Sequence, residues 1–378
     1  MIETIEPHKA AESAASRAPE VVLVTETDGF FGQRTKPWES MDTAKLLKAL
    51  SQHFLVRQTN YAAIASGVVD VRNSIVIHGS SQQSEYKAFI DDVLLYLYAA
   101  GNSLVPSIHI VRSHENKGYQ ELYKRLRGIK APPGQYGVKL SELNIETLKY
   151  PIVFKSISGF GSSGVKLIEK EDELKRAAHA EFLFSLGQIP KMVRSQLGYN
   201  VRKYLMRRRN LRPYGDYYRP LKRFVLQRFI PNLSFDFKVL VYQSRAFVLR
   251  RSVAENDFRA SGSGKFVFEI PPPGLLDFAR HLLLQFDEPY LSLDICFDGS
   301  DFHLLEFQGV HFGPYTLLNA PRHYVWDDSK WTIECSPVDL EDVTAESLIL
   351  YLKRTHGRQL SSELVVSGIP ARGCPEPT

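Results

Sequence analysis

At 378 residues the chain exceeds the size at which a single hydrophobic core stops growing, so we expect two or three domains. With 44% hydrophobic and 24% charged residues and a net charge of +5, its composition is ordinary for a globular protein. The cysteines Cys296, Cys335 and Cys374 lie far apart without a CxxC pair, which excludes a disulfide framework and a zinc ribbon and indicates a reducing, cytoplasmic setting.

Both ends of the chain are predicted to be tails. Residues 1–18 lack the basic segment and apolar core of a secretory signal, and we expect a disordered tail there. We expect a second flexible tail over 363–378. No stretch approaches eighteen uninterrupted apolar residues, so the sequence predicts no transmembrane span.

Residues 19–111 alternate between strand and helix patterns, which predicts a small parallel α/β domain. The loop after the first strand lies at the carboxyl edge of such a sheet, where open sheets bind ligands, so it is either a substrate surface or a plain connection. The predicted strands are Val21–Val24, Ser74–Ile77 and Ile108–Val111, and the predicted helices are Asp42–Phe54 and Gln83–Ala100.

The stretch Pro151–Ile168 is an apolar run containing Lys155, then a GxGxxG loop, then a second apolar run. A Rossmann fingerprint would need these glycines to open a helix, and a protein kinase would need later HRD and DFG motifs that this sequence lacks. Strand, glycine loop and strand suit a phosphate, because glycines let backbone N–H groups approach the anion and Lys155 would project toward it. The alternative is an ordinary hairpin with a lysine whose stem is buried.

Residues 188–223 contain eleven lysines or arginines, one acid and five tyrosines. Charges this dense repel one another unless an anion or solvent screens them. Nucleic acid, an acidic carrier protein, an anionic membrane face or a polyanionic substrate would serve, and so would plain solvent around a surface insertion.

Further along, the sequence predicts a strand at Phe224–Ile230, a hairpin over Phe235–Tyr242 and Ala246–Arg250, a helix over Leu275–Phe286, and a second hairpin within 291–314. If the loop of this second hairpin has three residues, Gly299–Asp301, then Asp294 faces Glu306 and Gln308 shares their side of the sheet. A loop of two or four residues would put the two carboxylates on opposite sides. Facing carboxylates suit a divalent cation, whereas single acids in strands usually keep an edge soluble.

Seven segments occur in an order that resembles the ATP-grasp superfamily, particularly its ribosomal-protein glutamate ligases and glutathione synthetases. They cover about 112–315 and are Asn116-Lys117 at the head of a helix, PIVFKSISGFGSSGV, LQRFI, DFKVLV, NDFRAS, LSLDI and LLEFQ. The resemblance implies an α/β protein in which a small N-terminal domain precedes two α+β subdomains that clasp ATP. These would be 112–228, carrying the basic insertion 188–223, and 229–362, carrying a metal site.

The resemblance also implies residue roles. Two lysines would contact the ATP phosphates, a lid would close over them, a hinge would meet adenine through its backbone, and one acid would take the ribose hydroxyls. Two basic residues would lie near the γ-phosphate and the acyl group, and three residues would hold one or two Mg²⁺ ions. The phosphate contacts would be Lys117 and Lys155, and the lid would be Gly159, Gly161, Ser162, Ser163 and Gly164. The hinge would be Gln227, Arg228, Phe229 and Ile230, and the ribose acid Asp236. The two basic residues would be Lys238 and Arg259, and the metal ligands Asp294, Glu306 and Gln308.

Two residues depart from the family pattern. Ser156 stands where proline is common, and Gln308 stands where asparagine is the usual third metal ligand. The amide oxygen of Gln308 can still coordinate, but it reaches one methylene further, which leaves the second metal position open.

The implied activity is an ATP-dependent carboxylate–amine ligase that forms an amide bond through an acylphosphate and releases ADP and phosphate. Its substrates would be small molecules or peptides, an acidic carrier protein or polyanion would suit 188–223, and homodimers are common in such enzymes. The absence of GxSxG and HExxH excludes a hydrolase triad and a zinc protease. His311 is either a proton acceptor or a structural residue. Two alternatives stay open: a kinase-like phosphotransferase acting on an anionic substrate, and a non-catalytic protein that binds nucleotide or nucleic acid.

Overall fold

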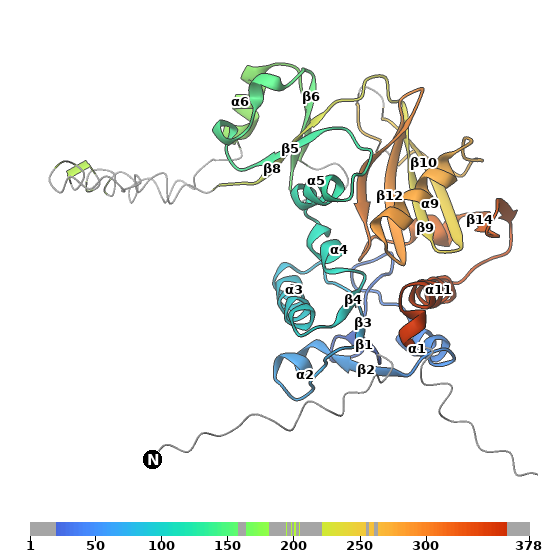
Figure 1. Ribbon diagram of the computed structural model, residues 1–378. Coiled ribbons are helices and arrows are strands. Elements are labelled where there is room, and N and C mark those ends of the chain that lie inside the picture. The colour runs from blue at the N-terminus through green and yellow to red at the C-terminus, as the bar shows by residue number, and fades with distance from the viewer. Residues whose placement is uncertain are drawn as a thin grey trace, which may run out of the picture.

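The computed structural model describes residues 20–157, 164–180, 221–254, 257–260 and 264–360, with a few single positions between 194 and 204. These residues form one parallel and two antiparallel sheets with helices around them, which confirms the predicted α/β class (Figure 1). Both predicted tails, the glycine-loop residues 158–163 and most of the basic insertion lie outside the described residues. No helix in the described part of the chain has the length and apolar character needed to cross a membrane.

The first sheet is parallel, with strand order β2-β1-β3-β4. Its strands are β1 (Val21–Thr25), β2 (Val56–Asn60), β3 (Ile75–His78) and β4 (Ser103–Val105), and its helices are α1 (Thr43–Ser51), α2 (Tyr61–Ala65) and α3 (Ser84–Ala99). The central strand β1 is completely buried because apolar side chains cover both of its faces. The side chain of Asp42 caps α1 by accepting a hydrogen bond from the N–H of Lys45, so this helix begins where its sequence predicts.

The prediction of a strand at Ile108–Val111 is wrong, because these residues begin helix α4 (Ile108–Ser113) and the strand is β4, just before it. A β-branched run favours a strand locally, but here tertiary packing decides. The backbone N–H of Ser107, at the start of α4, is bound by the buried carboxylate of Glu288, 3.0 Å away. The helix then buries Ile110 and Val111 in two different hydrophobic cores.

The second sheet is antiparallel, with strand order β5-β8-β6-β7. Its strands are β5 (Gly134–Gly137), β6 (Ile152–Ser156), β7 (Val165–Ile168) and β8 (Phe224–Arg228). The pairing of β6 with β7 places Lys155 opposite Val165 and confirms the predicted strand, loop and strand. Helix α5 (Lys117–Leu126), the short 3-10 turns η1 (Leu140–Glu142) and η2 (Ile145–Thr147), and α6 (Glu171–Ala180) complete this part.

The third sheet is antiparallel, with order β13-β12-β9-β10-β14-β15 and β11 added to β10. Its strands are β9 (Phe235–Tyr242), β10 (Arg245–Ser252), β11 (Phe266–Val267), β12 (Tyr290–Phe297), β13 (Phe302–Gln308), β14 (His323–Trp326) and β15 (Trp331–Glu334). Helix α9 (Leu275–Phe286) packs on the face that carries Phe237, Val239 and Val241. By alternation, Asp236 and Lys238 point to the opposite face.

The C-terminal helix α11 (Leu340–Leu360) returns to the first domain, where it lies beside α1 (Figure 1). Its Leu348 shares one core with Leu46 and Leu50 of α1 and with Phe247 of the third sheet. A short helix, α10 (Tyr315–Asn319), follows the loop after β13. The first and last parts of the chain therefore form one continuous core, while the predicted boundaries near 111 and 228 stay predictions.

The register of β12 and β13 decides which side chains share a face. Asp294 pairs with Glu306 and Ser292 with Gln308, but nearer the turn Ile295 pairs with Leu304, which leaves Leu305 as a bulge. Asp294 does face Glu306, although the turn has four residues and not the three that this pairing was expected to need. Its first residue, Asp298, stabilises it by accepting hydrogen bonds from the N–H groups of residues 300 and 301. Because the bulge adds one residue to β13, Glu306 lies on the same side of the sheet as Asp294. The four-residue turn alone would have put the two carboxylates on opposite sides.

Candidate functional site

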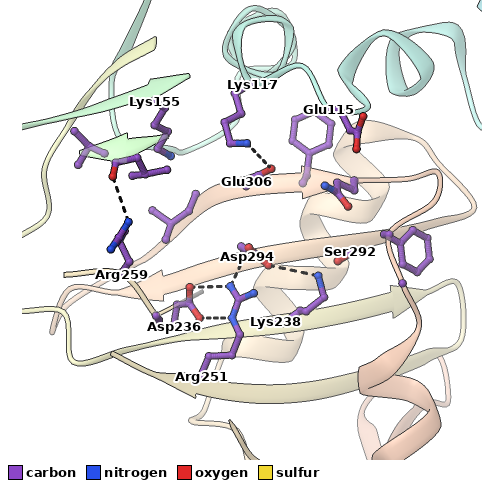
Figure 2. Close-up of a pocket in the computed structure, with 18 of the residues that line it drawn as sticks. Glu115, Lys117, Lys155, Asp236, Lys238, Arg251, Arg259, Ser292, Asp294 and Glu306 are labelled. Atoms are coloured by element: carbon purple, nitrogen blue, oxygen red, sulfur yellow. Dashed lines mark hydrogen bonds and ion pairs between the residues drawn. The ribbon is translucent and has the colours of Figure 1, made fainter. Parts of the chain in front are cut away.

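A cavity of about 580 Å³ lies between the second and third sheets and opens toward loops of the first domain. Figure 2 shows side chains from both sheets and from α5 pointing into it. Of the predicted site residues that the structure describes, all but Gly164 line this cavity. The sequence therefore placed together residues that are more than 190 positions apart.

Charged side chains from three neighbouring strands share one face of the third sheet. The register sets Glu306, Asp294 and Lys238 side by side on three neighbouring strands. Nζ of Lys238 lies 3.9 Å from one oxygen of Asp294, and Nζ of Lys117 lies 3.8 Å from Glu306 (Figure 2). Gln308 follows Glu306 two positions along the same strand. This cross-strand row is the charged floor of the cavity.

Arg251 is a site residue that the sequence prediction missed. Arg251 is a residue of β10 and lies directly opposite Asp236 of β9. Its guanidinium donates hydrogen bonds to both carboxylate oxygens of Asp236, at 2.7 and 2.8 Å. Its Nη2 also lies 2.9 Å from Asp294. Burial raises the pKa of Asp294, but the positive charges of Arg251 and Lys238 together hold it below its ordinary value, so this carboxylate is ionised at neutral pH. The pairing of β9 with β10 sets Arg251 opposite Asp236, so the register of these two strands was the signal that could have identified Arg251 as a site residue.

This pairing bears on the predicted contact between Asp236 and ribose. Asp236 is 6% exposed and both of its oxygens already accept from Arg251. In this arrangement it acts as the counter-ion of a buried guanidinium. The ribose role stays a prediction, and it would require one of these hydrogen bonds to be shared.

Two lysines face the carboxylates from the other side. Lys117 is the first residue of α5, whose end is fixed by the side chain of Asn116 accepting from the N–H of Tyr119. Lys155 projects from β6 beneath the second sheet (Figure 2). Burial lowers the pKa of Lys155, and the nearby Lys124 and Lys117 lower it further against the pull of Glu306. Positively charged side chains that lie close together repel one another, and an anion bound between them relieves this repulsion.

The segment after β8 forms one end of the cavity. Gln227, Arg228, Phe229 and Ile230 all line it, and the strand ends at Arg228, so the backbone beyond it is no longer part of the sheet. Gln227 is 2% exposed and its amide donates to Glu121 of α5. The geometry leaves the backbone of this segment beside the cavity; its predicted contact with adenine stays a prediction.

Arg259 reaches from the third sheet toward the second. Its Nη1 lies 3.5 Å from the carbonyl oxygen of Val165, and its guanidinium forms an ion pair with Asp257 at 2.6 Å. These hydrogen bonds lower the pKa of Asp257. The neighbouring Gly164 has φ +76°, and a Cβ there would lie 2.8 Å from Oγ of Ser156, so this position requires glycine. Gly159, Gly161, Ser162 and Ser163 lie outside the described residues.

The donor set fits magnesium. Asp294, Glu306 and Gln308 offer two carboxylates and one amide oxygen on one face, and magnesium is usually held by one or two carboxylates together with substrate phosphates and water. Within the described ranges no group of three His, Cys, Asp or Glu side chains is placed to hold a metal ion. The fit of Gln308 to a second ion stays a prediction.

The cavity ends at the first domain. Arg34, Thr35 and Pro37, from the loop after β1, line this end together with Gln82, so the loop is more than a connection. His114 and His311 also line this end, and the backbone N–H of His311 donates to the side-chain oxygen of Gln33, the residue before Arg34. Burial lowers the pKa of both histidines, that of His114 to about 3, so both are neutral at physiological pH. A proton-acceptor role for His311 stays a prediction.

Comparisons with known proteins find no matching family model and no matching curated protein. Among the solved structures that this chain resembles are ATP-grasp ligases. D-alanine–D-alanine ligase from Bacillus anthracis, complexed with ATP, shares 13% identity over 92% of this chain and all of its own, with a TM-score of 0.45. The D-cycloserine synthetase DcsG shares 14% over 88% of this chain and all of its own, with a TM-score of 0.48.

A third structure is the RiPP-associated ATP-grasp ligase of Chryseobacterium gregarium, in complex with ADP and a leader and core peptide. It shares 11% identity over 89% of this chain and 97% of its own, with a TM-score of 0.46. At this distance the comparison carries neither an activity nor a substrate to this chain.

Proposed function

We propose that this protein is an ATP-dependent carboxylate–amine ligase that forms an amide bond through an acylphosphate, releasing ADP and phosphate. The observation that supports it most directly is the facing pair Asp294 and Glu306, with Lys117 and Lys155 on the other side of the same cavity. Oxygen donors for a divalent cation opposite a cluster of ammonium groups match what a nucleoside triphosphate requires.

The chemistry explains why such a site contains cations. A carboxylate is a poor acyl donor, because its leaving group would be oxide. Transfer of the γ-phosphoryl group of ATP to the carboxylate yields ADP and an acylphosphate, in which that oxygen belongs to a phosphate leaving group. An amine then attacks the acyl carbon, and phosphate leaves with the bonding electrons. Phosphoryl transfer depends mostly on positioning and on neutralising charge, so a site of lysines, an arginine and magnesium ligands suits it without a nucleophilic side chain.

Each residue has a place in this scheme. Lys117 and Lys155 would bind phosphate oxygens, and the segment Gln227–Ile230 would hold the base. Arg259, with Lys238, would neutralise the charge that develops on the transferred group. Asp294, Glu306 and Gln308 would hold magnesium, which when bound neutralises phosphate charge and orients the chain of phosphates.

Phosphorus NMR of the purified protein with magnesium-ATP and pooled acids and amines tests the proposal. We expect ADP and free phosphate only when both an acid and an amine are present, and at least about a hundredfold slower turnover in Glu306→Gln. Glu269→Gln, which removes a partly exposed carboxylate paired with Arg250 outside the cavity, is the matched control.

Other outcomes would redirect the proposal. Phosphate retained on the acceptor would indicate the kinase-like phosphotransferase instead. Unchanged ADP formation in Glu306→Gln would reject the metal assignment. ATP binding with no turnover under any pool would reject ligase activity on small acids and amines.

A further inference from the structure

Three strained residues mark the end of the cavity nearest the first domain. Seven described non-glycine residues have positive φ, and four of them are Asn or Asp, which tolerate this conformation. The other three are Gln33 (φ +67°), Glu115 (φ +51°) and His311 (φ +50°). Glu115 and His311 line the cavity, and Gln33 directly precedes the lining residue Arg34. Such strain persists where the surrounding structure enforces it, often at binding sites.

These segments are locked together by short contacts. The side-chain oxygen of Gln33 accepts a hydrogen bond from the backbone N–H of His311 at 2.8 Å, in a buried position. A Cβ on Gly32 would lie 3.0 Å from Nδ1 of His311, and one on Gly309 would lie 2.5 Å from Cγ2 of Ile110. Loops that start in different sheets therefore meet without room for extra atoms. This end of the cavity is rigid before any ligand arrives.

Arg34 is held in place at this end. Its Nη2 lies 2.6 Å from Glu341 of α11, a carboxylate that is 2% exposed and also accepts from the N–H of Asp42. The side chain of Arg34 is 31% exposed. Among the described residues, its ion-pair partner is Glu341. An arginine fork anchored through one nitrogen still presents donors for a carboxylate in a fixed direction.

The surroundings make Arg34 selective for an anion. His114 and His311 are neutral, because burial lowers the pKa of both. Thr35 and Gln82 carry no charge. Glu115 is exposed at the same end, and its negative charge would repel an anion placed on its own side. An anionic group entering here is therefore directed onto Arg34.

From this geometry we infer that Arg34 binds a carboxylate that the reaction does not consume, so that the substrate at this end carries a second anionic group. The inference rests on the proposed function, because the cavity then has a nucleotide end at Gln227–Ile230 and a substrate end at Arg34. Dicarboxylic acids, acidic amino acids and peptides that keep a free carboxylate are the class it selects. Arg34 is a specificity residue in this account, and Glu341 positions it.

Saturation-transfer NMR tests this without turnover. The probes are glutarate, succinate and L-glutamate, each beside its side-chain or terminal monoamide, in the presence of magnesium and a non-hydrolysable ATP analogue. We expect the dicarboxylates to bind the wild type at least about tenfold more tightly than the amides, since hydrogen bonds to charged groups are the strong ones. Arg34→Gln should remove that preference, and Arg34→Lys should restore part of it.

Controls separate recognition from folding. Arg72→Gln removes an exposed arginine that is paired with Asp70 in the same domain but outside the cavity, and it should leave the preference intact. Glu341→Gln keeps the guanidinium but loosens its anchor, so we expect a smaller loss of preference. Thermal unfolding of each variant shows whether the fold persists.

The inference is overturned if wild type binds no dicarboxylate in preference to its amide, or if Arg34→Gln keeps the preference. Both outcomes are read from binding. A protein that prefers dicarboxylates but forms no ADP would leave the inference standing and reject the ligase chemistry, whereas ADP formation without any such preference would do the reverse.

Discussion

Nη2 of Arg251 lies 2.9 Å from Oδ2 of Asp294, so a proposed metal ligand already has a permanent cation on one of its two oxygens. The same guanidinium holds both oxygens of Asp236. The other oxygen of Asp294 faces Lys238 at the longer distance of 3.9 Å. Arg251 thus fixes the carboxylate in one orientation and leaves its second oxygen for the cavity.

Replacing Arg251 by methionine would leave the buried carboxylate of Asp236 without its ion-pair partner and would take one of two cations from the half-buried Asp294. We expect the free energy of unfolding to fall by about 3–5 kcal/mol, as is usual when one partner of a buried ion pair is removed. The matched control is Arg250→Met on the same strand, whose partner Glu269 is partly exposed, with an expected loss of about 1 kcal/mol or less. Urea unfolding measures both. Equal losses would mean that Arg251 has no special role in holding the carboxylates.

Arg259→Ala should slow ADP formation by about 10²- to 10³-fold while changing ATP affinity little, because its charge is needed mainly when charge develops in the transition state. Single-turnover kinetics and nucleotide titration separate the two effects. Lys166→Ala removes an exposed charge from β7 outside the cavity and serves as the control. A purely structural Arg259 would lower stability without this split.

Gln308 allows a test by paired substitutions. If its amide oxygen is a metal ligand, Gln308→Asn should keep activity within about tenfold, because the oxygen donor survives at a shorter reach. Gln308→Leu has nearly the same volume but no oxygen, and it should need much more magnesium for half-maximal ADP formation. The magnesium dependence of both variants decides the question, and identical curves would remove Gln308 from the metal site.

Glu288 predicts a pH-dependent stability. Burial raises its pKa from the ordinary value of 4.5 to about 8, and one of its oxygens lacks a hydrogen-bond partner among the described residues. Between these pH values the folded protein binds the proton that the unfolded chain releases, so stability is greatest below about pH 4.5 on this account and is lost as the pH rises to 8.

Glu288→Gln should remove this contribution and stabilise the protein near pH 8, because the amide needs no proton to stay neutral. The substitution should reduce the slope of the free energy of unfolding against pH by at most about 1.4 kcal/mol per pH unit. Urea unfolding from pH 5 to 8 measures it, with the exposed Glu142→Gln as control. Parallel stability curves for Glu288→Gln and wild type would show that the carboxyl is ionised throughout this range.

Much of the fold followed from local patterns. The strands around Lys155 and the hairpin of β9 and β10 alternate cleanly, so their pairing was predictable from sequence alone. The pairing of Asp294 with Glu306 was also predicted, but from the wrong turn. The four-residue turn alone would have separated them, and the bulge at Leu305 is a compensation that no local pattern announces.

Other features depend on contacts between distant segments. Ile108–Val111 has the composition of a strand, and only the buried Glu288 and two separate cores make it helical. The predicted strand ended at Arg250, and only the pairing of β9 with β10 places Arg251 beside Asp236 and Asp294. The strained Gln33 and His311 are held by each other across 278 positions.

The ion pair between Arg34 and Glu341 closes a loop of 307 residues. On the ribosome, the N-terminal domain therefore emerges long before the helix that completes its surface and anchors this arginine. Until residue 341 has left the exit tunnel, the faces of α1 and β1 that pack against α11 stay open to solvent and to chaperones. Contacts of such long sequence separation also slow folding in vitro. The end of the cavity at Arg34 is consequently completed last, and a chain truncated before Glu341 would lack the anchor of this arginine.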